Sequence, residues 1–310
     1  MKISDTSAQY HYCSIAPNGN LVAFGKRGRM QIYNQENKKM YQMNTLPNIS
    51  MIKFIDDDRI LICSKKKISL YYISSQRCSE MEIHSNLRVV DCVMSDNNQI
   101  LLIGDYVEYT RECFVPIACI STEPLQILAF DRLQNVYDAF GYWSTVCKSF
   151  LLAALYVLRQ KEFPMITSKM QFFNVSQKGI VLSSEAKRKN DDHSLEYFFW
   201  DENKIVSFHS GFFYLASVPG MEVIERKYPR KMNSEEDIVT WKFHSASRRL
   251  YYIVEKTQSQ HFEVCFFEWE TDKHKSIAVQ DGNISFLEIS SNGKRIVVGT
   301  DTGIYLYDAD

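Results

Sequence analysis

A four-strand pattern that returns along the whole chain constrains the fold more than any other feature of the sequence. Segments such as 68–72 (ISLYY) and 304–307 (IYLY) are short, rich in β-branched and aromatic residues and bounded by turn residues, as is typical of strands. Each repeat contains an apolar strand, a polar turn, a second apolar strand, an aromatic third strand, a further turn and a fourth strand. No long stretch has a clear helical stripe, and Phe150–Arg159 comes nearest to one.

The polar turn between the first two strands marks each repeat. It occurs at Asn18-Gly19, Asp57-Asp58, Asn97-Asn98, Cys147-Lys148, Glu202-Asn203, Ser247-Arg248 and Asn292-Gly293. Seven repeats in 310 residues give about 44 residues each, which is the size of a four-stranded β-propeller blade.

The sequence therefore predicts an all-β fold, a seven-bladed β-propeller of four-stranded antiparallel blades. We name the strands of a blade a to d from the inside outward, and expect one domain over residues 1–310. The expected blades are 10–46, 47–86, 87–131, 132–185, 194–228, 236–280 and 282–310, the last completed by residues 2–8. The fourth repeat is the least regular, so a count of six or eight blades stays open. The last repeat has no strand d of its own, and an N-terminal strand there would close the open edges.

The final repeat also carries recognisable motifs. Residues 299–308 (GTDTGIYLYD) are similar to the hairpin between strands b and c of the WD40-like propellers. Tyr307-Asp308 stands where that family often has Trp-Asp, and Asp301 matches its usual turn aspartate. The other repeats lack a Gly-His before strand a and a Trp-Asp at the end of strand c. The chain thus resembles a degenerate WD40-like propeller by its period throughout and by motif in its last repeat. The resemblance implies the fold, and implies function only by analogy.

Composition and motifs restrict the compartment and the chemistry. The chain begins without the apolar region of a secretory signal, and its longest apolar run, Phe150–Leu158, is too short to span a bilayer as a helix. The eight cysteines include no Cys-x-x-Cys pair, so we expect buried free thiols in a cytoplasmic protein with no membrane association. Because the histidines are dispersed and phosphate-binding glycine motifs are absent, we expect no metal site, no cofactor and no catalytic residue.

The long connections between strands point to a binding surface. In a propeller, the b–c and d–a connections share one face. The long ones are b–c in blade three (Asp105 to Glu112) and four (Arg159 to Lys169), d–a after blades four (Glu185 to His193) and five (Tyr228 to Glu236), and b–c in blade six (Glu255 to Gln260). Long ordered loops tend to carry function, although neutral lengthening of exposed loops is the alternative. We expect a protein or peptide partner to bind this face of blades 3–6. The candidate contact residues are Tyr106, Tyr109, Arg111, Phe163, Tyr228 and Arg230.

Two other functions were weighed against this one. A nucleic-acid partner is not expected, because basic runs such as Lys187-Arg188-Lys189 are balanced at once by nearby acidic residues, and the net charge is only −1. The alternative function is an enzyme of the hydrolase or lactonase-like propeller type, with a site in the central channel. The inner strands offer it these polar or aromatic residues: His11, Tyr12, Lys53, Asp91, Asp138, Tyr142, Glu196, Trp241 and Glu288. We expect a monomeric, non-catalytic interaction scaffold.

Overall fold

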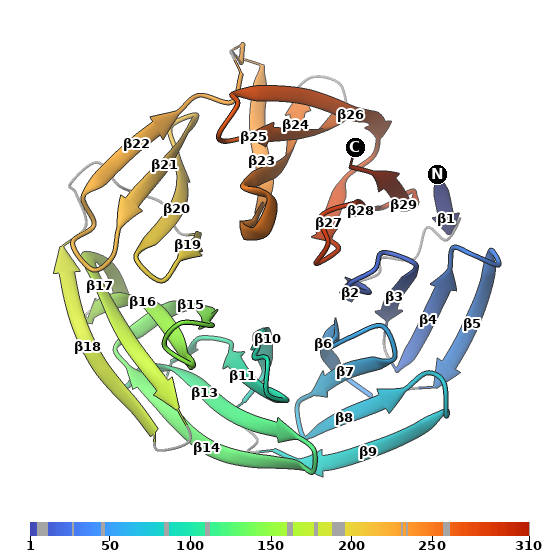
Figure 1. The fold of residues 1–310 in the computed structure, drawn as a ribbon, viewed down its shortest axis with the longest axis horizontal. Helices are drawn as coiled ribbons and strands as arrows, with labels where there is room; N and C mark the ends of the chain where they lie inside the picture. Colours follow the sequence, from blue (N-terminus) through green and yellow to red (C-terminus); the bar gives the residue numbers. More distant parts are fainter. Residues whose placement is uncertain are drawn as a thin grey trace. The chain divides into compact units, whose positions relative to one another are not determined.

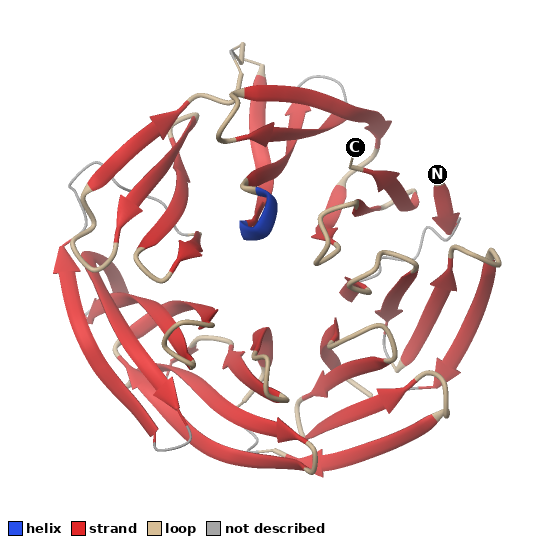
Figure 2. Ribbon diagram, in the orientation of Figure 1, coloured by secondary structure: helices blue, strands red, loops and turns tan. Residues whose placement is uncertain are grey.

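The computed structural model is built almost entirely of β-strands (Figure 2). It describes residues 1–4, 12–26, 28–44, 47–83, 87–108, 112–159, 164–176, 179–187, 196–230, 232–233, 235–256 and 261–309. The one helical element among them is the 3-10 turn Ser245–Ser247. Figure 1 labels the strands, which form seven separate antiparallel sheets in these described ranges.

The first three sheets follow one another along the chain. Blade 1 consists of β2 (Tyr12–Ile15), β3 (Leu21–Lys26), β4 (Arg29–Asn34) and β5 (Lys39–Asn44). Blade 2 consists of β6 (Ile49–Phe54), β7 (Arg59–Ser64), β8 (Lys67–Tyr72) and β9 (Arg77–Glu82). Blade 3 consists of β10 (Val89–Met94), β11 (Gln99–Gly104), β13 (Cys113–Thr122) and β14 (Leu125–Gln134), with the short β12 (Val107–Glu108) paired to β13.

The remaining sheets repeat the same order. Blade 4 consists of β15 (Val136–Ser144), β16 (Ser149–Arg159), β17 (Pro164–Ser176) and β18 (Gly179–Lys187). Blade 5 consists of β19 (Tyr197–Asp201), β20 (Lys204–His209), β21 (Phe212–Ser217) and β22 (Val223–Lys227). Blade 6 consists of β23 (Glu236–His244), β24 (Arg249–Lys256), β25 (His261–Glu268) and β26 (Lys273–Asp281). Blade 7 consists of β27 (Ile284–Ile289), β28 (Arg295–Thr300), β29 (Gly303–Asp308) and β1 (Lys2–Ser4). The fold is a seven-bladed β-propeller, as the sequence predicts.

The N-terminal strand completes the last blade. β1 pairs antiparallel with β29, with Lys2 opposite Tyr305 (Figure 1). The ammonium group of Met1 donates to the carbonyl oxygen of Leu306 at 2.7 Å, and the Leu306 N–H donates to the carbonyl oxygen of Met1 at 2.8 Å. This pairing confirms the predicted closing strand for residues 2–4, while residues 5–8 lie outside the described part.

Blade 4 differs from the sequence prediction. Its b–c connection was expected to run from Arg159 to Lys169, but β16 continues to Arg159 and β17 begins at Pro164. The long connection expected there is therefore wrong. The pairing resumes after a bulge between Leu155 and Val157, so that Arg159 lies opposite Pro164. The d–a connection after this blade was expected from Glu185, yet β18 extends to Lys187.

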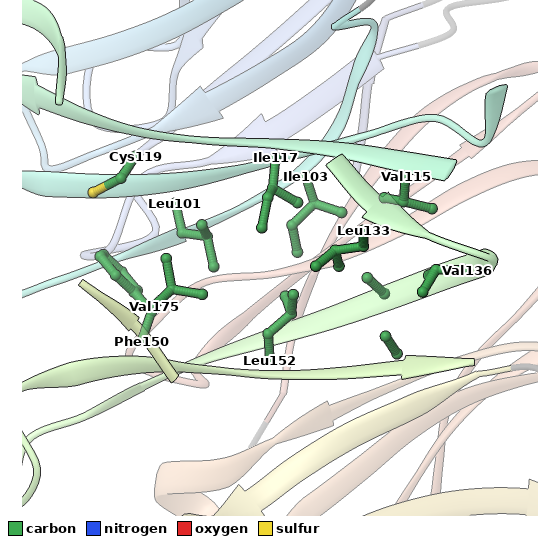
Figure 3. Close-up of a cluster of buried hydrophobic side chains, with 12 residues drawn as sticks. Leu101, Ile103, Val115, Ile117, Cys119, Leu133, Val136, Phe150, Leu152 and Val175 are labelled. Atoms are coloured by element: carbon green, nitrogen blue, oxygen red, sulfur yellow. The ribbon is translucent and has the colours of Figure 1, made fainter. Parts of the chain in front are cut away.

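The core consists of apolar clusters that join neighbouring sheets. The cluster in Figure 3 takes buried side chains from blade 3, such as Leu101 and Ile117, and from blade 4, such as Phe150 and Leu152. Sheets that are covered on both faces need near-continuous apolar strands, which explains runs such as 150–155 (FLLAAL). Large aromatic side chains fill many such places, with Tyr197 and Tyr251 among the most buried. All eight cysteines are free; six of them are buried, as expected, whereas Cys78 and Cys147 are exposed.

The chain divides into two compact units. Unit 1 comprises residues 1–64, 71–78 and 227–310, and unit 2 comprises residues 65–70 and 79–226. Blades 1, 6 and 7 belong to unit 1, and blades 3 and 4 belong to unit 2, together with blade 5 up to Arg226.

Candidate functional site

The six predicted contact residues fall into three groups. Tyr109, Arg111 and Phe163 lie outside the described residues. Tyr228 and Arg230 belong to unit 1, in the connection between β22 and β23. Tyr106 belongs to unit 2, in the connection between β11 and β12.

The Tyr228–Arg230 segment is exposed at one end and anchored at the other. The Tyr228 side chain is 43% exposed, and its hydroxyl accepts a hydrogen bond from the Met232 N–H at 3.1 Å. Arg230 is partly buried, with Nη2 3.0 Å from Oε1 of Glu236 and Nη1 2.6 Å from Oε2 of Glu263. Arg230 therefore anchors the segment, and its contact with a partner stays a prediction.

The carboxyl group of Glu263 is held ionised at this anchor. Burial works against its ionisation, but hydrogen bonds from Ser276 and from Arg230 outweigh burial and lower its pKa below the usual value. An ionised Glu263 beside the guanidinium of Arg230 gives a charge-assisted pair, which is stronger than a neutral hydrogen bond. The anchor thus fixes the course of the backbone next to Tyr228.

Tyr106 lies against another aromatic ring in unit 2. Its ring centroid is 5.4 Å from that of Tyr137, with an angle of 45° between the planes. Tyr106 is half-buried, and Tyr137, in strand a of blade 4, is 37% exposed. The predicted residue is therefore part of an aromatic pair whose second member was not among the candidates.

Carboxylates gather on the inner strands of unit 2. Asp138 of β15 is half-buried, and burial raises its pKa to about 6, with further contributions from the negative charges of Asp91, Glu196 and Asp105. The Ala139 N–H donates to Asp138 Oδ1 at 2.8 Å and opposes this shift. Two of these carboxylates, Asp91 and Glu196, were named for the enzyme alternative, and the third, Asp105, was not.

The inner strands of unit 1 carry a mixed set of charges. Lys53 Nζ lies 3.7 Å from Oε2 of Glu288, and Lys242 Nζ lies 3.8 Å from Oε1 of the same carboxylate. Glu288 is therefore compensated by two lysines. Trp241, another inner-strand candidate, is buried, and His11 lies outside the described residues. Among the described residues, no group of three His, Cys, Asp or Glu side chains could hold a metal ion.

Two signals in the sequence could have identified the carboxylate region. Val89-Val90-Asp91 and Val136-Tyr137-Asp138 each open the first strand of a blade and place an aspartate at the same position. Loop length does not point to either aspartate, because both lie on strand a; the sequence places Asp91 and Asp138 on inner strands but does not show that they lie close together.

Comparisons with known proteins agree with the fold. No protein-family model matches the sequence, and no curated protein matches it. A chain in the crystal structure of the mitotic checkpoint complex is similar in structure, with a TM-score of 0.64 and 8% sequence identity, covering 99% of this chain and 92% of that chain. Within the described ranges, no helix is long and apolar enough to cross a membrane. Each of the seven blades has strands a to d, blade 3 has the additional β12, and the N-terminal strand completes the last blade, so the chain has the fold of a seven-bladed β-propeller.

Proposed function

We propose that this protein is a non-catalytic interaction scaffold that binds a protein or peptide partner through the b–c and d–a connections of blades 3–6. Propellers of this fold commonly act as protein-interaction scaffolds, and the similar chain belongs to a protein assembly, the mitotic checkpoint complex. Fold alone is a weak argument for function, so the proposal depends on the connections themselves.

The observation that carries the proposal is that Tyr228 is exposed while the segment that bears it is held in place. A tyrosine offers a large amphipathic surface at low conformational cost, which is why tyrosines are frequent at interface hot spots. The segment that bears Tyr228 is held by Arg230, through Glu236 and Glu263, and by the hydrogen bond from Met232. A segment that is ordered before binding loses less conformational entropy when a partner binds.

The test compares two exposed tyrosines in affinity purification from the native host with mass spectrometry. We expect Tyr228→Ala to lose a partner that the wild type retains. Tyr41→Ala is the matched control, since Tyr41 is 46% exposed and its hydroxyl also accepts one hydrogen bond, from Asn37. Tyr41 lies on β5, an outer strand of blade 1, away from the connections that the proposal concerns. Equal recovery of partners by both variants and the wild type would reject a role for Tyr228.

A second candidate function is an enzyme of the hydrolase or lactonase-like type that uses Asp138. The observation that favours it is the raised pKa of this carboxyl, about 6, because a general acid or base works best with a pKa near the operating pH. A panel of aryl esters and lactones should then be hydrolysed by the wild type and not by Asp138→Asn. Hydrolysis at the rate of buffer alone would remove this candidate.

A further inference from the structure

The first strands of blades 3 and 4 share a backbone irregularity. In β10, Val89 lies opposite Gly104 and Asp91 opposite Ile103, so that Val90 is an extra residue in the pairing. In β15, Val136 lies opposite Tyr156 and Asp138 opposite Leu155, so that Tyr137 is the extra residue. A bulge of this kind redirects a side chain and interrupts the alternation of the strand.

The bulges expose apolar side chains. Val90 is 46% exposed and Tyr137 is 37% exposed, while the residues before them, Val89 and Val136, are fully buried. Tyr106 extends the exposed ring of Tyr137 through their contact at 5.4 Å. More than a third of each of these apolar side chains remains exposed on an inner strand, so packing in the core accounts for only part of Val90 and Tyr137.

The same bulges orient carboxylates beside these apolar side chains. Asp91 follows Val90, and its Oδ1 accepts the N–H of Cys92 at 2.8 Å. Asp138 follows Tyr137, and its Oδ1 accepts the N–H of Ala139 at the same distance. Each aspartate is therefore held by the next backbone N–H, and its second oxygen, Oδ2, takes no part in that bond.

The charge around this surface is negative. Asp138 interacts with Asp91, Glu196 and Asp105. Asp105 is paired, since Nη1 of Arg88 lies 3.1 Å from its Oδ2. In the described part of the chain, Asp91 and Asp138 have no such ion pair, and no group of three His, Cys, Asp or Glu side chains could hold a metal ion.

We propose that Val90, Tyr106 and Tyr137, with Asp91 and Asp138, form a docking surface for a basic peptide segment that carries an apolar side chain. This surface, the blade 3–4 patch, takes Tyr106 from the b–c connection of blade 3 and its other residues from the first strands of blades 3 and 4. The proposal rests on the proposed function and extends its binding surface from the connections to strand a. The apolar side chain of the peptide packs on Val90 and Tyr137. Lysine or arginine side chains on either side of it pair with the carboxylates. A guanidinium group suits this surface best, since it binds carboxylates in a bidentate manner and stacks on tyrosine rings.

Charge complementarity selects this occupant. An acidic segment would be repelled by Asp91 and Asp138, because like charges across an interface strongly disfavour binding. A wholly apolar segment would leave Asp91 and Asp138 desolvated without a counter-charge. A basic segment with one apolar anchor satisfies both halves of the patch.

The test uses three short fluorescein-labelled peptides and fluorescence anisotropy with the purified full chain. The first peptide has a central leucine flanked by arginines, the second has glutamates in place of the arginines, and the third has alanine in place of the leucine. We expect the first peptide to bind at least tenfold more tightly than the second and about fivefold more tightly than the third. Binding of the first peptide should also weaken as salt is raised.

Variants then locate the binding site. The pair Asp91→Asn and Asp138→Asn keeps the side-chain oxygens that accept backbone N–H groups, and should weaken the first peptide at least tenfold. Val90→Ser with Tyr137→Ser should reduce the preference for leucine over alanine. Asp131→Asn is the control, because Asp131 is exposed and also accepts the N–H of the next residue, at 2.7 Å. Thermal denaturation of each variant confirms that it is folded before it is used.

The outcomes distinguish this inference from the proposed function. Equal binding of the arginine and glutamate peptides, absence of measurable binding, or full binding by the double aspartate variant would overturn the docking surface. If Tyr228→Ala loses its native partner while the basic peptide fails to bind, the interaction scaffold stands and the blade 3–4 patch falls. If the basic peptide binds as expected while Tyr228→Ala keeps all partners, the patch stands and the role of the Tyr228 segment falls.

Discussion

The raised pKa of Asp138 makes the stability of the protein depend on pH in an unusual direction. A carboxyl group that forms an ion pair in the folded state makes the protein less stable on acidification. Asp138 has the opposite effect, because it is half-buried among like charges. Its pKa is about 6 in the folded protein, against 3.8 for an unperturbed aspartate. The folded state therefore binds a proton more tightly than the unfolded chain does, and folding becomes less favourable as the pH rises between these values.

The magnitude follows from the difference between the two pKa values. About 2 pKa units correspond to about 3 kcal/mol, at about 1.4 kcal/mol for each unit. This contribution is present below about pH 4 and is lost as the pH rises through about 6, so that at pH 7 the ionised Asp138 destabilises the fold. The partial exposure of Asp138 allows water to screen the charge, which makes about 3 kcal/mol an upper bound.

Asp138→Asn removes the charge and keeps the oxygen that accepts the Ala139 N–H. We expect this variant to be more stable than the wild type at pH 7, by up to about 3 kcal/mol, and within about 0.5 kcal/mol of it at pH 4. Urea denaturation at a series of pH values, followed by tryptophan fluorescence, measures the difference. Asp131→Asn, at an exposed site with the same local hydrogen bond, should change the unfolding free energy by less than about 0.5 kcal/mol at either pH. A difference between Asp138→Asn and the wild type that stays constant from pH 4 to pH 7 would refute the reasoning.

Two further predictions concern the closing strand and the anchor of the Tyr228 segment. Ile3→Ala removes a buried side chain that packs against Ile304, and should destabilise the fold by about 2–4 kcal/mol in urea denaturation. The control Val279→Ala, at an exposed site, should cost less than about 0.5 kcal/mol. Equal effects of the two variants would mean that β1 does not stabilise blade 7. Arg230→Gln leaves two partly buried carboxylates without their cation and should cost about 1–3 kcal/mol, against less than about 1 kcal/mol for Arg88→Gln, whose ion pair is exposed. The same denaturation curves test the second pair, and an equal loss for both arginines would contradict the anchoring role.

The seven-fold repeat could be predicted because its a–b turns can be recognised from their residue types and from the apolar strands on either side. In five of the seven predicted a–b turns, the second residue has the left-handed backbone conformation. These residues are Gly19, Asn98, Lys148, Arg248 and Gly293. Asparagine and glycine favour this conformation, so the turns at Asn97-Asn98 and Asn292-Gly293 carry their own signal. Lysine and arginine do not favour it. The turns at Lys148 and Arg248 were found from the strands on either side of them.

The length of the blade 4 strands could not be predicted in the same way. Residues 167–169 (TSK) have the polarity of a loop, yet they belong to β17. Lys169 lies opposite Lys187 in the pairing and forms an ion pair with Glu185 of β18. Pairing of this kind depends on cross-strand neighbours far along the chain, which the local pattern does not contain. A polar stretch at the end of a hairpin therefore looks the same in the sequence whether it is loop or strand.

Only part of the candidate site could be predicted, because the sequence pattern shows loop length but not the pairing of strand a. Loop length singled out Tyr106 and the Tyr228 segment, but it gave no information about strand a. A bulge near the start of strand a occurs in blades 2, 3, 4, 6 and 7 of the described structure, at Ser50, Val90, Tyr137, Val239 and Ser285. The bulge thus belongs to the fold of the blade, while the residue at the bulge varies from one blade to the next.

This variation shows where a propeller can acquire a binding function without loss of stability. In blades 3 and 4 the residue before the bulge is fixed by the core, as Val89 and Val136 are fully buried. The residue at the bulge has no such constraint, because the extra position takes its side chain out of the strand alternation. Ser50 is used within its own blade, where it donates to the carbonyl oxygen of Cys63 at 3.4 Å. Val90 and Tyr137 stay exposed beside aspartates. An apolar residue at such a position, followed by a charged one, is therefore better explained by a partner than by packing.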